Sequence, residues 1–147
     1  MNRDFAEMLS ALFVARAEFL VVGAHALAAH GYPRATGDLD IWVRPTRENG
    51  ERVLAALRVF GAPLFDLTLD DLSRPGIVFQ IGLPPARIDI LTGISGVEFD
   101  GAWTGRMVAN VAGQELPFIG REDLIRNKRA AGRAKDLADV EALEQKR

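Results

Sequence analysis

The chain has 147 residues, of which 48% are hydrophobic and 26% charged, and these values are typical of one globular domain with its own core. It contains no cysteine, which excludes disulfides, thiolate metal sites and thiol nucleophiles, so any metal must bind to oxygen or imidazole ligands. The formal net charge of −2 does not indicate a polyanionic partner, although a local basic patch could still bind one. No run of about 18 consecutive apolar residues occurs, so we expect a soluble cytoplasmic protein without a membrane partner.

Helices and strands alternate in the first part of the chain. Apolar residues at the i, i+3, i+4, i+7 spacing predict an amphipathic helix over residues 2–17. The short apolar run 19–22, closed by Gly23, predicts a buried strand, and the Ala-rich segment 25–30 predicts a short helix after it. Strand, glycine turn and helix therefore follow one another without a linker.

The middle of the chain continues this alternation. Period-2 spacing over residues 38–43 predicts a strand with two different faces. Thr46 is a suitable N-cap for a helix that extends to Phe60 and stops at Gly61. The pattern of segment 64–76 is ambiguous and predicts no particular element.

The last part predicts further strands and then helices. Segments 77–83 and 87–91 have the composition of two strands, and a hairpin is expected across residues 106–119. From Glu122 onward the chain is rich in helix formers, and Gly132 favours a break between two helices. The whole pattern indicates an α+β protein with a mixed sheet.

Two aspartates lie in the strand predicted over residues 38–43. Because side chains alternate across a strand, Asp38 and Asp40 project from one face. Neighbouring carboxylates repel each other, and a divalent cation such as Mg²⁺ or Mn²⁺, which prefers hard oxygen ligands, removes that cost. Asp89 is a third acid on a predicted strand, and the three acids converge if its strand neighbours that of Asp38. A D-x-D pattern also occurs on solvated sheet faces, so the motif needs support from its context.

The glycine turn supplies that context. Gly23 permits close approach of the backbone to a phosphate, and the helix that starts near Ala24 and His25 offers unpaired N–H groups. A phosphate site and a metal site would then adjoin.

These residues match the signature of a known family. An apolar strand is followed by Gly23-Ala24, then by Asp38-x-Asp40, and Asp89 lies on a later strand. They resemble the nucleotidyltransferase superfamily, which shares its fold with DNA polymerase beta, and in particular its small bacterial members related to abortive-infection and toxin–antitoxin nucleotidyltransferases. The tail segments 123–128 and 132–139 are similar to the C-terminal helical part of that group.

The resemblance implies a fold and an architecture. We expect an α+β fold with a nucleotidyltransferase-type mixed β-sheet, flanking helices and a short C-terminal helical part over about residues 122–147. Residues 1–147 would form a single nucleotidyltransferase-like domain.

The resemblance also implies a reaction, the transfer of a nucleoside monophosphate from an NTP to a hydroxyl acceptor on a tRNA end or a protein. In that scheme Asp38 and Asp40 bind Mg²⁺ or Mn²⁺, and Asp89 completes the metal site and helps to deprotonate the acceptor. Lys128 is the first candidate for a charge on the triphosphate, and Lys135 is the second, on the same helical face if Gly132 does not break the register. A cognate toxin or antitoxin would be the partner.

Further nucleotide contacts are expected at the glycine turn and before the acids. Gly23 and Ala24 would contact phosphate through their backbone, and Thr36 directly precedes the metal site. Asp136 follows Lys135 as a further candidate in the tail.

One departure from the family pattern concerns the second residue of the Gly-Gly or Gly-Ser pair, which is Ala24 here. Alanine cannot add the hydroxyl contact of a serine, although the backbone donors remain. The alternative hypothesis is therefore a catalytically weak or inactive module that binds a nucleotide or a partner with the same fold. A metal-dependent nuclease or phosphohydrolase would use the same acids, but the sequence has no evident base to activate water.

Other polar and aromatic residues favour structural roles. His25 and His30 lie on an Ala-rich segment and are expected to be hydrogen-bonded within the fold, and Trp42 is expected to pack. Five basic residues cluster near the C-terminus, where they would form either an RNA-binding surface or a helix surface balanced by acids: Arg126, Lys128, Arg129, Arg133 and Lys135.

Overall fold

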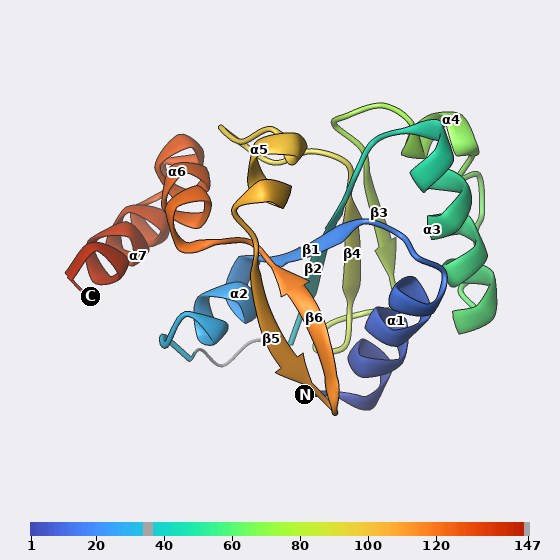
Figure 1. Cartoon of the computed structure of the whole chain (residues 1–147), viewed down its shortest axis with the longest axis horizontal. Coiled ribbons are helices and arrows are strands. Elements are labelled where there is room, and N and C mark those ends of the chain that lie inside the picture. The colour runs from blue at the N-terminus through green and yellow to red at the C-terminus, as the bar shows by residue number, and fades with distance from the viewer. Residues whose placement is uncertain (34–36, 146–147) are drawn as a thin grey trace.

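The computed structural model describes residues 1–33 and 37–145 and consists of one six-stranded sheet with helices packed around it (Figure 1). The strands are β1 (Phe19–Val22), β2 (Leu39–Val43), β3 (Val78–Ile81), β4 (Ile88–Leu91), β5 (Met107–Val111) and β6 (Gln114–Phe118). The helices are α1 (Arg3–Val14), α2 (Gly23–Ala29), α3 (Arg47–Phe60), α4 (Leu69–Leu72), α5 (Phe99–Thr104), α6 (Arg121–Ala131) and α7 (Ala134–Gln145). This is the α+β architecture with a mixed sheet that the sequence predicts.

The strand order is β3-β4-β2-β1-β6-β5. Strands β2 and β4 pair in parallel, as do β1 and β6, and the other pairs are antiparallel. The chain leaves β2, passes through α3, α4 and β3, and returns to lie beside β2 as β4. In Figure 1, α1 and α3 lie on one side of the sheet, and α2, α6 and α7 lie on the other.

The central strands form the core. All four residues of β1 are buried, which is the pattern of a strand covered on both faces. Helix α1 adds the apolar stripe that its periodicity predicts, with Phe5, Met8, Leu9 and Leu12 buried. Burial of each such side chain stabilises the fold by about 1.5–3 kcal/mol relative to exposure. Trp42 is 1% exposed and meets the Phe99 ring edge-on, so its expected packing role is confirmed.

Helix boundaries follow local capping. The Thr46 side chain accepts a hydrogen bond from Asn49 N, and Gly61 ends α3 in the left-handed conformation at a φ of 90°. Helix α1 ends at Val14, three residues before the predicted limit of residue 17. Gly132 ends α6 in the same left-handed way, at a φ of 70°. It therefore breaks the register between Lys128 and Lys135, and the two lysines lie on different helices.

Two short helices are absent from the prediction. Helix α4 falls in the ambiguous segment and is held by a capping box between Thr68 and Asp71. Helix α5 has only six residues, one of them a glycine, and its stability depends on the burial of Phe99 and Ala102 against the sheet. Such short helices depend on tertiary packing because intrinsic propensity cannot offset the cost of nucleation. Within residues 1–33 and 37–145, no helix has the length and apolar character needed to cross a membrane.

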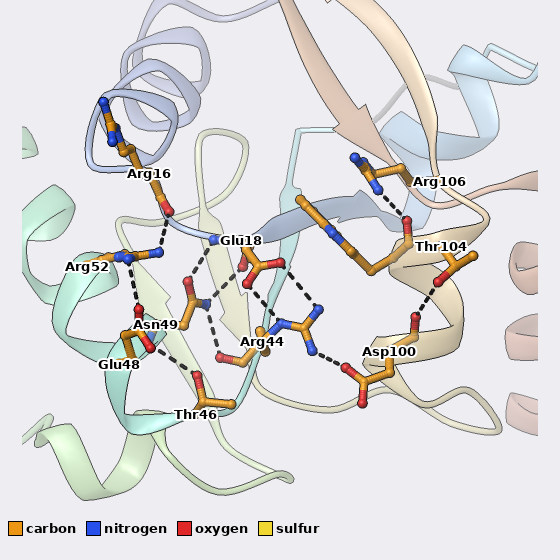
Figure 2. Close-up of polar contacts among 11 residues, drawn as sticks. Arg16, Glu18, Arg44, Thr46, Glu48, Asn49, Arg52, Asp100, Thr104 and Arg106 are labelled. Carbon is orange, nitrogen blue, oxygen red and sulfur yellow. Dashed lines mark hydrogen bonds and ion pairs between the residues drawn. The ribbon is translucent and has the colours of Figure 1, made fainter.

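A polar network ties α3 to the ends of β1 and β2 that lie away from the acidic residues (Figure 2). The buried Asn49 side chain accepts a hydrogen bond from Glu18 N at 2.7 Å and donates to Glu18 O and Arg44 O at 2.9 and 3.0 Å. The Arg44 guanidinium extends the network to Glu18 and Asp100 and lies over the Phe99 ring. One amide side chain thus satisfies backbone groups at two strand ends.

We predict that Asn49→Ala lowers the free energy of unfolding by about 1–3 kcal/mol, because Glu18 N loses its acceptor and Glu18 O and Arg44 O each lose one of two donors. Urea denaturation monitored by circular dichroism measures this change. Glu48→Ala, on the same helix with a side chain 79% exposed, serves as the control and should change stability by less than about 0.5 kcal/mol. Equal denaturation midpoints for the Asn49 variant and the wild type would contradict the structural role of the amide.

Candidate active site

The turn between β1 and α2 lies directly over one of the acids. Gly23 has a φ of 67°, which L side chains rarely adopt. A Cβ atom at this position would lie 2.4 Å from Asp40 Oδ2, so a side chain there would collide with the carboxylate. Glycine is therefore required both by the backbone conformation and by the close approach to Asp40.

Parallel pairing of β2 and β4 brings the acids together. Asp40 and Asp89 are direct neighbours in the register of the two strands, as the sequence analysis anticipates for adjacent strands. Asp38 immediately precedes β2, which begins at Leu39. All three acids line one polar cleft of about 320 Å³. The other residues that line it are Gly23, Ala24, Leu27, Arg87, Lys128, Arg133, Lys135 and Asp139.

An arginine that the sequence analysis does not identify lies among the acids. Arg87 Nη2 is 3.1 Å from Asp38 Oδ2, and Arg87 Nε is 3.0 Å from Asp89 Oδ1. Arg87 Nη2 also donates a hydrogen bond to Asp89 Oδ2 at 3.3 Å. Its position in the sequence could have identified it. Arg87 lies two residues before Asp89, and side chains two residues apart in an extended segment project from the same face.

The Asp40 carboxyl group is perturbed by its surroundings in the cleft. Burial, followed by the charge and hydrogen bond of Asp89 and the charge of Asp38, raises the pKa of Asp40 to about 6, against the opposing effect of Arg87. Asp89 is 7% exposed, so its carboxylate also lies in a poorly solvated place. The site therefore favours an additional cation or a proton.

The cationic side of the cleft comes from α6 and α7. Lys128 is 9% exposed, and its Nζ lies 2.9 Å from Asp139 Oδ2 and 3.5 Å from Asp136 Oδ1. Burial acts to raise the pKa of Asp136, but hydrogen bonds and charge from Arg133, together with the charge of Lys128, hold it below its usual value. Lys128 is thus a buried link between the two helices, whereas Lys135 is exposed at the same cleft.

The chemistry of the donors fits a divalent cation. Three carboxylates supply hard oxygens on one cleft, and the raised pKa of Asp40 indicates a shortage of positive charge beside it. Within the part of the chain that the structure describes, however, no three His, Asp or Glu side chains are arranged to hold a metal ion. The expected Mg²⁺ or Mn²⁺ and the ligand roles of Asp38, Asp40 and Asp89 stay predictions.

The remaining predicted residues divide into three groups. Gly23 and Ala24 line the cleft, as expected for phosphate contacts, while Thr36 lies outside the described residues. His30 Nε2 is 2.8 Å from Ile119 O, a hydrogen bond within the fold. His25 packs against the Phe5 ring, and burial followed by the charge of the N-terminus lowers the pKa of its imidazole. His30 therefore has the hydrogen-bonded structural role expected for it, whereas His25 packs in the fold with its Nε2 buried and without a hydrogen-bond partner among the described residues.

Comparisons with known proteins address the fold. No family model matches the chain, and no curated protein matches it in sequence. Among solved structures, a protein of Thermotoga maritima assigned to the nucleotidyltransferases has 15% identity and a TM-score of 0.63, covering 99% of this chain and 92% of its own. The antibiotic-resistance factor ANT(2'')-Ia has 14% identity and a TM-score of 0.64, covering 97% of this chain and 81% of its own. The chain therefore has the nucleotidyltransferase fold.

The raised pKa of Asp40 predicts a pH-dependent stability. A carboxyl group whose pKa is about 6 when folded and about 3.9 when unfolded contributes stability below pH 4 that is lost as pH rises through 6. Asp40→Asn removes the charge, so in EDTA it should be more stable than the wild type at pH 8 by about 1–2 kcal/mol, with the difference vanishing near pH 4.

Urea denaturation at pH 4, 6 and 8 measures the difference. Asp66→Asn, at an exposed position, is the control and should show no comparable trend. An Asp40→Asn variant that is less stable than the wild type at pH 8 would exclude the proposed repulsion.

Proposed function

We propose that this chain is a metal-dependent nucleotidyltransferase that transfers a nucleoside monophosphate from an NTP to a hydroxyl acceptor and releases pyrophosphate. The observation that supports this most directly is the register of β2 and β4, which sets Asp40 beside Asp89 in a cleft that also contains Asp38. The nucleotidyltransferase fold of the chain agrees with this class of reaction.

The three acids would have different roles in the reaction. Asp38 and Asp40 would hold Mg²⁺ or Mn²⁺. The ion, when bound, would neutralise the phosphate charge and stabilise the negative charge on the attacking and leaving oxygens. Asp89, largely buried beside Asp40, would complete the ligand set and accept the proton of the attacking hydroxyl. Gly23 has no side chain, so the Asp40 carboxylate can lie directly against the turn at the edge of the cleft.

The contacts of the two lysines suggest different roles for them. Lys128 already has Asp136 and Asp139 as close partners, so we assign it the positioning of α7 relative to α6. Lys135 is exposed at the cleft and is the better source of charge for the triphosphate. This reverses the order that the sequence analysis assigns to the pair.

The charges on the C-terminal helices favour a protein hydroxyl over a tRNA end as the acceptor. The Arg126 guanidinium pairs with Asp123 at 2.6 Å, and the Arg129 guanidinium pairs with Glu144 at 2.6 Å. An RNA partner gains affinity from cations that are available to its phosphates, and paired arginines provide less of that gain. A protein acceptor also suits the toxin–antitoxin partner that the family resemblance implies.

Ala24 supports a second candidate, a module that binds nucleotide without turnover. Its side chain offers no hydroxyl at the cleft, which leaves only backbone donors at this point of the turn. The three acids favour the enzyme over the module. Clustered carboxylates repel one another and destabilise the fold, and a module that binds no metal would not need them.

We predict that incubation with α-labelled NTPs, Mg²⁺ and a cell lysate transfers label to a fraction that protease destroys and ribonuclease does not. Asp89→Asn should reduce the transfer by more than about 100-fold, because it removes the proposed proton acceptor. Asp66→Asn is the matched control and should retain full transfer.

The same experiment separates the alternatives. Label in bulk tRNA would overturn the protein acceptor, and label that persists in Asp89→Asn would show that the site is wrong. NTP binding without transfer to any fraction would favour the non-catalytic module. Failure to bind any NTP would exclude both functions.

The two lysines should separate nucleotide binding from stability. Lys135→Met should weaken Mg²⁺–NTP binding about tenfold and change the free energy of unfolding by less than about 0.5 kcal/mol. Lys128→Met should lower that free energy by about 3 kcal/mol, since it leaves two buried carboxylates without their shared cation. Calorimetric titration and urea denaturation measure the two effects. A Lys128→Met protein of normal stability that fails to bind NTP would restore Lys128 as the phosphate contact.

A further inference from the structure

The Arg87 guanidinium has the position of a counter-ion within the acid cluster. It faces both oxygens of Asp89, at 3.0 and 3.3 Å, and one oxygen of Asp38 at 3.1 Å. Two of the three acids that would bind a divalent ion are therefore engaged by one side chain of the same chain. Arginine is suited to this because it keeps its charge at all relevant pH values and has several donors in a fixed plane.

The fold places Arg87 there through strand geometry. Arg87 directly precedes β4 and lies two residues before Asp89, so in extended chain their side chains leave the same face of the sheet. The backbone is also fixed at this point, because Leu39 N donates a hydrogen bond to Arg87 O at 3.0 Å. That bond joins the start of β4 to the start of β2, next to Asp38.

A metal ion and the guanidinium compete for these oxygens. Mg²⁺ binds oxygen at about 2.1 Å and demands near-octahedral geometry, so it needs carboxylate oxygens that are free to turn toward it. Arg87 nitrogens lie 3.0–3.3 Å from both Asp89 oxygens and from one Asp38 oxygen. Two cations so close together would also repel each other.

The contact of the Arg87 guanidinium with the acids can be broken without disturbing the fold. Its Nη2 donates a hydrogen bond to Asp89 Oδ2, whereas Nε and Oδ1 of the same pair lie 3.0 Å apart without hydrogen-bond alignment. The Arg87 side chain is 29% exposed and lines the open cleft, so its head can leave the acids without unfolding β4.

We propose that Arg87 is an internal counter-ion that competes with the divalent metal for Asp38 and Asp89. Metal binding then requires the guanidinium to leave the acids and enter the cleft. Arg87 lowers the affinity for free metal and partly neutralises the acid cluster until the ion arrives. This inference rests on the proposed function, since it concerns the ion which that function needs.

The test is the binding of Mn²⁺ to metal-free protein without nucleotide, measured by electron paramagnetic resonance and calorimetry. Arg87→Met should bind Mn²⁺ roughly tenfold more tightly than the wild type, because the competing cation is gone. Arg74→Met removes an arginine that is 63% exposed and pairs only with Asp71 among the ion pairs described, so it should bind as the wild type does. Circular dichroism confirms that each variant is folded.

Two further measurements keep the test decisive if Arg87→Met does not fold. Arg87→Lys keeps the charge but loses the planar fork, and its Mn²⁺ affinity should lie between those of the wild type and Arg87→Met. In the wild type itself, Mg²⁺ should change the nitrogen resonance of Arg87 Nε and accelerate the exchange of its proton with water.

The possible outcomes separate the inference from the proposed function. If the wild type binds Mn²⁺ and Arg87→Met binds it equally or more weakly, Arg87 does not compete with the metal, and the proposed function stands. An Arg87 resonance that Mg²⁺ leaves unchanged also overturns the competition. Absence of Mn²⁺ binding by the wild type and every Arg87 variant would overturn the metal-dependent function and this inference together.

Discussion

The parallel pairing of β2 with β4 is the constraint on which the site depends. It sets Asp40 directly beside Asp89 and brings two negative charges together where solvent is scarce. Such an arrangement is unfavourable by itself, because burial and like charge both act against ionisation. The surrounding structure supplies what offsets it, with Arg87 among the acids and further cations on the helices that face them.

The two ends of the sheet serve different purposes. Asn49 and Arg44 join strand ends and helices through uncharged and charged hydrogen bonds, which gives a rigid base. At the opposite ends of β1 and β2, the backbone turns at Gly23, where the absence of a side chain lets the Asp40 carboxylate lie close to the turn. A rigid base supports an open, polar cleft, which is the arrangement that a reactive site needs to keep its acids in place.

Much of the fold and part of the site follow from the sequence. The apolar stripe of residues 2–17, the Thr46 cap and the Gly132 break predict elements that the structure contains, with ends that differ by a few residues. Helix α5 was not predictable, because its few residues depend on packing against the sheet. The roles of the acids as metal ligands remain predictions, since Arg87 contacts two of them and no three-ligand arrangement occurs among the described residues.

The sequence by itself determined the longer helices, the strands, the acidic motif and the family resemblance, because periodicity, caps and motifs act over a few neighbouring residues. Only the tertiary structure decided which strand lies beside β2, and therefore that Asp89 meets Asp40. It also decided that Arg87 lies between Asp38 and Asp89. These outcomes depend on strand order, register and helix packing between residues far apart in the chain, and no local pattern contains that information.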